Sequence, residues 1–188
     1  MTQKQRELLL DKFVNDIVND ILRNRKKKKP LTNNSDSDFI RAFFEEEKID
    51  EEEIRRLLIE AISDNCEEDF DLLLSLLEHF NLVRNYTLIL APLLIQPWHH
   101  FHDKIANILE FNVDNRIVDY LFKGALYSCE NLEYESDYCE FNRKCLFALA
   151  KIGTFEAINR IKEVEKLGNS IVAGYARSIL VIYKFIPE

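Results

Sequence analysis

Two stretches of this 188-residue chain align with each other at an offset of 40 residues: LEFNVDNRIVDYL at 109–121 and LAKIGTFEAINRI at 149–161. Their apolar residues fall at matching helical positions, and each stretch has a helix-capping residue at its joint, Asp114 in the first and Thr154 in the second. A third, partial copy at 172–185, VAGYARSILVIYKF, supplies one more helix. A period of about 40 residues with two helices per repeat is typical of stacked helical hairpins.

The rest of the chain also favours helices. Its 4 Gly and 4 Pro are too few for a sheet protein with many hairpins. Apolar residues recur at helical spacing, beginning with a stripe that starts at Leu10. The predicted helices cover residues 3–28, 38–47, 51–64, 67–81, 86–95, 98–111, 114–127, 138–152, 154–167 and 170–185. Asp50 is predicted to cap the third of these, and Gly153 and Gly168 are predicted to end helices in the left-handed conformation. We therefore expect an all-α fold.

The segment KCLFALAKIGTFEAINRIKEVEKLGNSIVAGYARSIL at 144–180 resembles a HEAT-type repeat array, and the resemblance extends over about residues 86–185. It implies a right-handed α-solenoid of stacked antiparallel helix pairs at 86–188, preceded by an N-terminal helical region at 1–85. An insertion at 128–138 departs from a minimal repeat, and residues 1–85 align with no repeat.

The stretch QPWHHFHDK at 96–104 raises the question of a metal site. With Pro97 at the first position of a helix, His99 and His102 share one face, whereas His100 projects away from it. Helical metal pairs are commonly two histidines four residues apart with further ligands elsewhere, and that spacing is absent. We expect no metal here. Two alternatives remain: a polar helix start with Trp98 packed on its neighbour, or a patch in which Trp98, His99 and His102 contact a partner.

The insertion and its flanks form a strongly acidic, tyrosine-bearing segment. The residues predicted to bind a partner there are Glu130, Glu133, Tyr134, Glu135, Asp137, Tyr138 and Glu140. Five carboxylates in so short a segment exceed what turn geometry requires, although a solvated loop remains the simpler alternative. In the functional interpretation, this acidic lip pairs with lysines and arginines of a basic protein surface, and its tyrosines anchor the contact.

Charge is unevenly distributed along the chain. The net charge is −8; residues 1–30 carry 9 basic and 4 acidic side chains (+5), and the remainder carries 16 and 29 (−13). An acidic body disfavours nucleic acid, whose binding depends on neutralising phosphates. The basic run RNRKKKK at 23–29 is typical of a solvated helix end, with a nucleic-acid, membrane-surface or localisation patch as the alternatives.

Other sequence features concern location and cofactors. The longest apolar run, at 88–95, is too short to span a bilayer, and the N-terminus lacks the apolar core of a signal peptide, so we expect a cytoplasmic protein. The four cysteines show no CxxC pair and are expected to be reduced, with Cys145 on an apolar stripe. No glycine-rich phosphate loop is present, and no cofactor is expected.

No set of nucleophile, base and orienting acid can be assembled from this sequence, and we expect a protein without enzymatic activity. HEAT-like DNA glycosylases use a basic concave face that the repeat region lacks. Small, acidic HEAT-like proteins resemble immunity proteins encoded beside bacterial toxins. That resemblance implies direct one-to-one binding of a basic toxin domain, for example a nuclease. The alternative is a scaffold or adaptor of the same fold.

Overall fold

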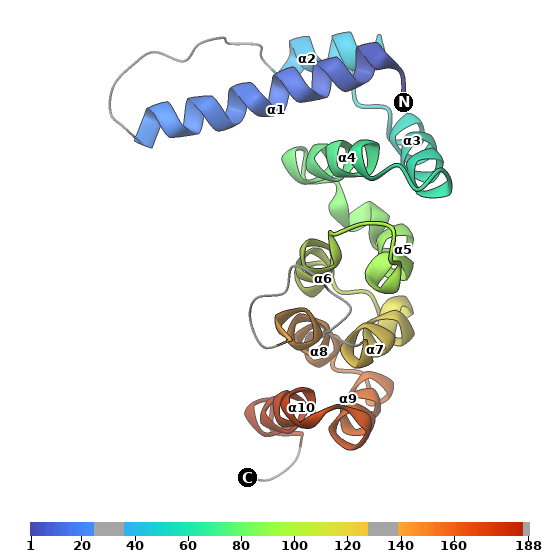
Figure 1. The fold of residues 1–188 in the computed structure, drawn as a ribbon, viewed down its shortest axis with the longest axis vertical. Helices are drawn as coiled ribbons and strands as arrows, with labels where there is room; N and C mark the ends of the chain where they lie inside the picture. Colours follow the sequence, from blue (N-terminus) through green and yellow to red (C-terminus); the bar gives the residue numbers. More distant parts are fainter. Residues whose placement is uncertain (25–35, 128–138, 186–188) are drawn as a thin grey trace. The chain divides into compact units, whose positions relative to one another are not determined.

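The computed structural model describes residues 1–24, 36–127 and 139–185, and for residues 14–24 it describes the backbone alone. These described residues form ten α-helices joined by turns and short 3₁₀ segments, and they contain no β-strand (Figure 1). The prediction of an all-α fold is thereby confirmed. In the same part of the chain, no helix combines the length and the apolar character that a bilayer crossing requires.

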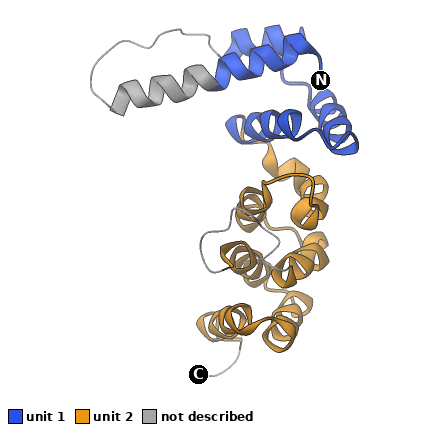
Figure 2. Ribbon diagram, viewed as in Figure 1, with its two compact units in different colours: residues 1–80 blue, residues 81–188 orange. Residues whose placement is uncertain are grey.

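The chain divides into two compact units, Met1–Phe80 and Asn81–Glu188 (Figure 2). The sequence pattern changes a few residues later, at Tyr86. The two boundaries differ because the 3₁₀ turn Val83–Tyr86 packs against α5 (Thr87–Leu90). This turn therefore belongs to the second unit, although it precedes the change in sequence pattern.

Unit 1 contains four helices: α1 (Gln3–Asn24), α2 (Asp36–Phe44), α3 (Glu51–Ser63) and α4 (Glu67–His79). Helix α1 packs against α2 and α4, and α3 packs against α4. The buried apolar side chains of α3 and α4 are Ile54, Leu57, Leu58, Ala61, Phe70, Leu73, Leu74, Leu76 and Leu77. Their helical spacing is the reason that both helices could be located from the sequence.

Helix α1 buries a different side chain from the one that the apolar stripe indicated. Leu9 is fully buried, whereas Leu10 is 51% exposed. Leu9 and Leu10 are adjacent on α1, and each lies three or four residues before Phe13 of the stripe. Helical spacing alone therefore does not decide which of them faces the core. The basic run at 23–29 lies largely outside the described residues.

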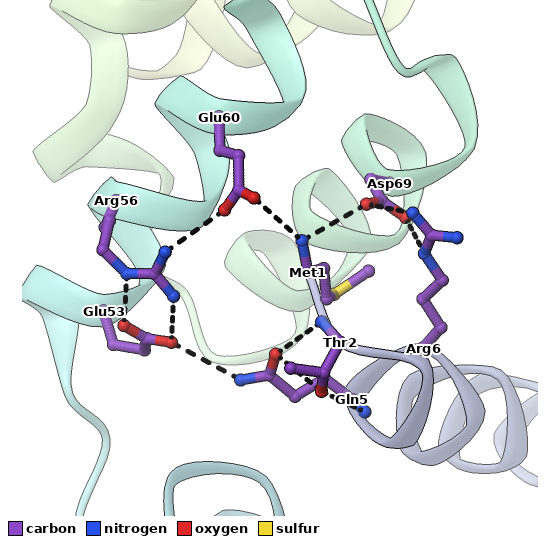
Figure 3. Close-up of polar contacts among 8 residues, drawn as sticks. All are labelled: Met1, Thr2, Gln5, Arg6, Glu53, Arg56, Glu60 and Asp69. Atoms are coloured by element: carbon purple, nitrogen blue, oxygen red, sulfur yellow. Dashed lines mark hydrogen bonds and ion pairs between the residues drawn. The ribbon is translucent and has the colours of Figure 1, made fainter. Parts of the chain in front are cut away.

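A network of polar contacts joins the start of α1 to α3 and α4 (Figure 3). The amino group of Met1 lies 3.7 Å from the carboxylate of Glu60 and 3.6 Å from that of Asp69. Asp69 is 3% exposed and also pairs with Arg6, whose Nε lies 2.6 Å from Oδ1 and whose Nη2 donates to Oδ2 at 2.8 Å. A buried carboxylate is costly unless it is paired in this way, so Asp69 favours this placement of α1 within unit 1.

Asp50 caps α3 as the sequence predicted. Its side chain accepts hydrogen bonds from the backbone N–H groups of Glu52 at 3.0 Å and Glu53 at 3.1 Å. Replacement of Asp50 by alanine is expected to lower the free energy of unfolding by about 1 kcal/mol, because these donors at the helix start lose their acceptor. Chemical denaturation followed by circular dichroism measures the change. The matched control is Asp50→Asn, which retains a capping oxygen and should remain close to wild type; an equal loss in both variants would contradict the capping role.

Unit 2 continues after α5 with a 3₁₀ segment, Ala91–Ile95, and then five helices. These are α6 (His102–Phe111), α7 (Val118–Leu126), α8 (Glu140–Ile152), α9 (Phe155–Leu167) and α10 (Ser170–Ile182). Within this unit, α6, α8 and α10 follow one side, and α5, α7 and α9 follow the other (Figure 1). Helix α8 contacts all of its neighbours α6, α7, α9 and α10, and α7 also contacts α9.

Three ion pairs in unit 2 join residues that are all 41 positions apart. Lys144 Nζ lies 2.7 Å from Asp103 Oδ1, Lys151 Nζ lies 2.7 Å from Glu110 Oε1, and Arg160 Nη2 lies 2.6 Å from Asp119 Oδ1. The first two connect α6 with α8, and the third connects α7 with α9. The same residue offset therefore relates α6 to α8 and α7 to α9. The spacing agrees with the offset of 40 residues found in the sequence.

The caps at the two aligned joints are confirmed. Asp114 accepts from the N–H of Arg116 at 2.8 Å, and Thr154 accepts from the N–H of Ala157 at 3.2 Å. Gly153 ends α8 in the left-handed conformation, with φ of 65°. The same prediction for Gly168 is wrong, because its φ is −67° and Asn169 immediately caps the next helix.

Candidate protein-binding surface

The histidine segment does not begin a helix at Pro97. Residues 97–101 form turns, and α6 starts at His102. The reason is that both predicted site histidines bind backbone groups that precede them. His99 Nε2 lies 3.0 Å from the carbonyl oxygen of Leu93, and His102 Nε2 lies 2.8 Å from that of Gln96. These bonds fold the segment back on itself.

His99 and His102 lie inside unit 2, where their ring centroids are 4.5 Å apart. They are 1% and 6% exposed, so they offer no surface to a partner, and the prediction that they contact one is wrong. Trp98 is half-buried and packs edge-on against the His99 ring, with 4.8 Å between centroids. The structure contradicts the helix start of the structural alternative, and a partner contact of Trp98 stays a prediction.

Both ring nitrogens of His99 are occupied. The N–H of Phe101 donates to Nδ1 at 3.1 Å, so the proton of the neutral ring is on Nε2, which donates to Leu93. Burial and, next in size, the neighbouring His102 together lower the pKa of His99 to about 4, against the opposing effect of the hydrogen bond to the Leu93 carbonyl. Burial likewise lowers the pKa of His102. A neutral histidine with both nitrogens bonded to backbone has no lone pair left for a metal ion.

Most of the predicted acidic lip falls outside the described residues: Glu130, Glu133, Tyr134, Glu135, Asp137 and Tyr138. Its last member, Glu140, opens α8 and pairs through both carboxylate oxygens with Arg143. Within the described part of the chain, Glu140 is thus already engaged by a cation of its own helix.

The cysteines differ in part from the expectation of four reduced thiols. Cys145 is buried and Cys66 is half-buried, and neither forms a disulfide. Cys139, which directly precedes α8, is disulfide-bonded, so the expectation is wrong for this residue. Cys129 lies outside the described residues. Sequence spacing misses this bond because Cys139 belongs to no short cysteine motif.

A buried asparagine connects the two helices on either side of the insertion. Asn142 on α8 is fully buried, and its Nδ2 donates to the carbonyl oxygens of Gly124 at 3.0 Å, Ala125 at 3.1 Å and Tyr127 at 2.8 Å. These carbonyls belong to the last turn of α7 and its cap, where Gly124 also accepts the backbone N–H of Tyr127 at 3.1 Å. One side chain therefore satisfies the end of α7 from α8; we refer to Asn142 and these bonds as the brace.

Exposed apolar side chains gather at the turns that lead into α5, α7 and α9, at residues 84–88, 111–116 and 151–155, which we call the joint edge. Four of the ten exposed large apolar side chains of the described residues belong to it: Leu88 at 41%, Phe111 at 71%, Val113 at 41% and Phe155 at 81%. Single exposed apolar residues are ordinary on protein surfaces, whereas a gathering of them marks an interaction site.

Some contacts link neighbouring turns of the joint edge. Lys151, at the end of α8, pairs with Glu110 and places its ammonium 4.3 Å from the ring centroid of Phe111. Phe155 follows just beyond the same turn of the chain. At the other end, one pocket is lined by both Leu88 and Val113. The joint edge thus combines aromatic and aliphatic surface with nearby cations, a composition that suits protein–protein contact.

The sequence analysis did not identify the joint edge, because it followed only the apolar residues that repeat at helical spacing. Phe155 offers a signal that could have found it. It directly follows the capping residue Thr154, and the buried residues of α9 begin only at Ala157. A large aromatic side chain that lies before the stripe has no packing role to explain it.

Comparison of this chain with protein-family models, with curated proteins and with solved structures finds no match.

Proposed function

We propose that this chain is a HEAT-type helical-repeat module whose function is to bind another protein. The fold part of the proposal is supported by the three ion pairs with a common separation of 41 residues and by the two capped joints. In such arrays each repeat contacts its neighbours, and the turns along one edge remain available to a partner. The proposal identifies unit 2 as a right-handed α-solenoid of antiparallel helix pairs.

The observation that carries the binding function is the joint edge. Phe111 and Phe155 are the most exposed large apolar side chains of the described residues, and both lie on it. Neither contributes to the core, so their exposure costs solubility without stabilising the fold. Aromatic residues of this kind supply most of the binding energy where a partner covers them.

The proposed partner is a basic protein domain, and the proposed role is that of an immunity protein that neutralises a bacterial toxin by direct binding. Residues 31–188 carry 16 basic and 29 acidic side chains, a net charge of −13. A charge of this size accelerates association with a basic partner. In this scheme the joint edge provides anchoring area, and the acidic lip around Glu133 and Asp137 provides charge complementarity.

The first test is a titration against the protein encoded immediately upstream of this chain, which the immunity hypothesis identifies as the toxin. Wild type and a Phe111→Ser, Phe155→Ser double variant are compared by isothermal titration calorimetry. Loss of one central aromatic anchor costs about 2 kcal/mol, so we expect binding at least about 30-fold weaker. The control is Ile59→Ser, which removes an apolar side chain that is 50% exposed in unit 1. Equal affinities for wild type and the double variant would exclude the joint edge.

The same titration at two salt concentrations tests the acidic lip. A Glu133→Lys, Asp137→Lys variant should bind more weakly and should show a smaller loss of affinity with added salt, because exposed charges act over a distance that salt shortens. An adaptor would have no toxin as its neighbour, and the upstream protein would not bind at all. That result would reject the immunity role while leaving the repeat fold untouched.

A further inference from the structure

A pocket of about 370 Å³ opens on the joint edge between the turns at 84–88 and 112–116. Its lining residues include two arginines, Arg84 and Arg116, and two aliphatic residues, Leu88 and Val113, whose side chains are half-exposed. The acidic group in the lining is Asp114. Cations beside aliphatic surface suit a ligand that is itself an anion on an aliphatic stem.

The charge of Asp114 is neutralised within the pocket. Arg116 Nη2 donates to Oδ2 at 2.6 Å, and Arg116 Nε donates to Oδ1 at 3.0 Å. Oδ1 also accepts the backbone N–H of Arg116, as part of the helix cap. These hydrogen bonds lower the pKa of Asp114, which stays ionised and bound to its arginine.

Arg84 supplies the positive charge of the pocket that Asp114 does not neutralise. Its side chain is exposed, and among the described residues it takes part in no ion pair. The pocket therefore has a net positive charge on a chain whose net charge is −8. An uncompensated guanidinium at the wall of a cavity is a ready partner for a carboxylate, which it binds through two parallel hydrogen bonds.

A second pocket, in unit 1, lacks this property. It is lined by Lys4, Glu45, Asp50 and Glu53, among others, and its charged groups are already engaged. Lys4 pairs with Glu45 at 3.2 Å, Asp50 caps α3, and Glu53 pairs with Arg56 at 2.7 Å. Of these two pockets, the one with Arg84 thus has a charged group that no ion pair between described residues neutralises.

We propose that the pocket of Arg84 binds the carboxylate of a glutamate side chain on the partner protein. The carboxylate pairs with Arg84, and the methylene groups of the glutamate contact Leu88 and Val113. The assignment of this carboxylate to a partner protein rests on the proposed function. The affinity of the pocket for a carboxylate on an aliphatic stem does not. A glutamate in this position would fix the register of a partner along the joint edge, because its anchor is a single point between two turns.

The test uses glutarate as the probe and the amide resonances of the full chain as the readout. A molecule with nine non-hydrogen atoms is expected to bind with a Kd on the order of 10 mM, with shifts confined to residues 84–88 and 112–116. Glutaramide, which has the same stem without charge, should cause no such shifts. Inorganic phosphate at the same concentration should cause weaker ones; shifts of equal size would overturn the preference for a carboxylate on an aliphatic stem.

Two variants make the test specific. Arg84→Gln should weaken glutarate binding at least about 10-fold, because it removes the charged hydrogen bonds. Asp114→Asn keeps an oxygen that caps the helix and frees Arg116, so glutarate should bind several-fold more tightly than to wild type. Arg177→Gln, on an exposed arginine of α10, is the control and should change nothing. Absence of glutarate shifts in wild type, or no gain in Asp114→Asn, would overturn the proposal and leave the partner titration as a separate question.

Discussion

Replacement of Asn142 by leucine is expected to lower the free energy of unfolding of unit 2 by about 3 kcal/mol, since buried carbonyl groups lose their donor. Leucine has a similar volume, so the packing around α8 is largely kept while the brace is lost. The carbonyls of Gly124, Ala125 and Tyr127 would then remain buried at the end of α7 without that partner. This loss exceeds the expected effect of removing the α3 cap.

Urea denaturation measures the change in stability, with the fluorescence of Trp98 as the signal. Trp98 is the single tryptophan of the chain and lies in unit 2, so it reports on that unit directly. The control is Asn115→Leu, at an exposed asparagine of the joint between α6 and α7. We expect that control to stay within about 0.5 kcal/mol of wild type. A loss below about 1 kcal/mol in Asn142→Leu would show that water replaces the brace at little cost.

Acid is expected to destabilise unit 2 through His99. The pKa of its ring is about 4 in the folded protein and 6.5 in the unfolded chain. Below pH 6.5 the unfolded chain therefore binds a proton that the folded protein does not. Stability falls as the pH is lowered from 6.5 towards 4 and stops falling below the folded pKa. Linkage gives a loss of about 2 kcal/mol between pH 7 and pH 5.

His102 adds a loss in the same direction, because burial lowers its pKa as well. Nuclear magnetic resonance of the imidazole nitrogens provides a measurement that does not depend on stability. It should show His99 neutral at pH 5, with its proton on Nε2. Exposed His100 supplies the control: His100→Gln should keep the slope of stability against pH, whereas His99→Gln should reduce it. An unchanged slope in His99→Gln would place the titrating group elsewhere.

The helices were predictable because their apolar residues repeat with the period of a helix, as Ile54, Leu57, Leu58 and Ala61 do on α3. The caps Asp50, Asp114 and Thr154 were predictable for a similar reason, since capping depends on a residue type at one local position. Both features are decided within a few residues of the chain.

Features that depend on distant contacts were not predictable. His99 and His102 became buried because backbone carbonyls of residues 93 and 96 accept their protons, an arrangement that helical periodicity does not contain. Pro92, with no N–H, lies in the 3₁₀ segment that replaces the second half of a helix predicted to reach residue 95.

The brace has a consequence for how this chain can vary. The chain leaves α7 at Tyr127 and re-enters α8 at Glu140, and the bonds from Asn142 hold these two points together. The ends of the connection are thus held together by contacts between described residues of α7 and α8. Doubling the length of a closed loop adds only about 0.6 kcal/mol, so its composition and length can diverge at small cost. A helical protein of this design can exchange one connecting segment for another, by evolution or by engineering, while α7, α8 and the brace stay the same.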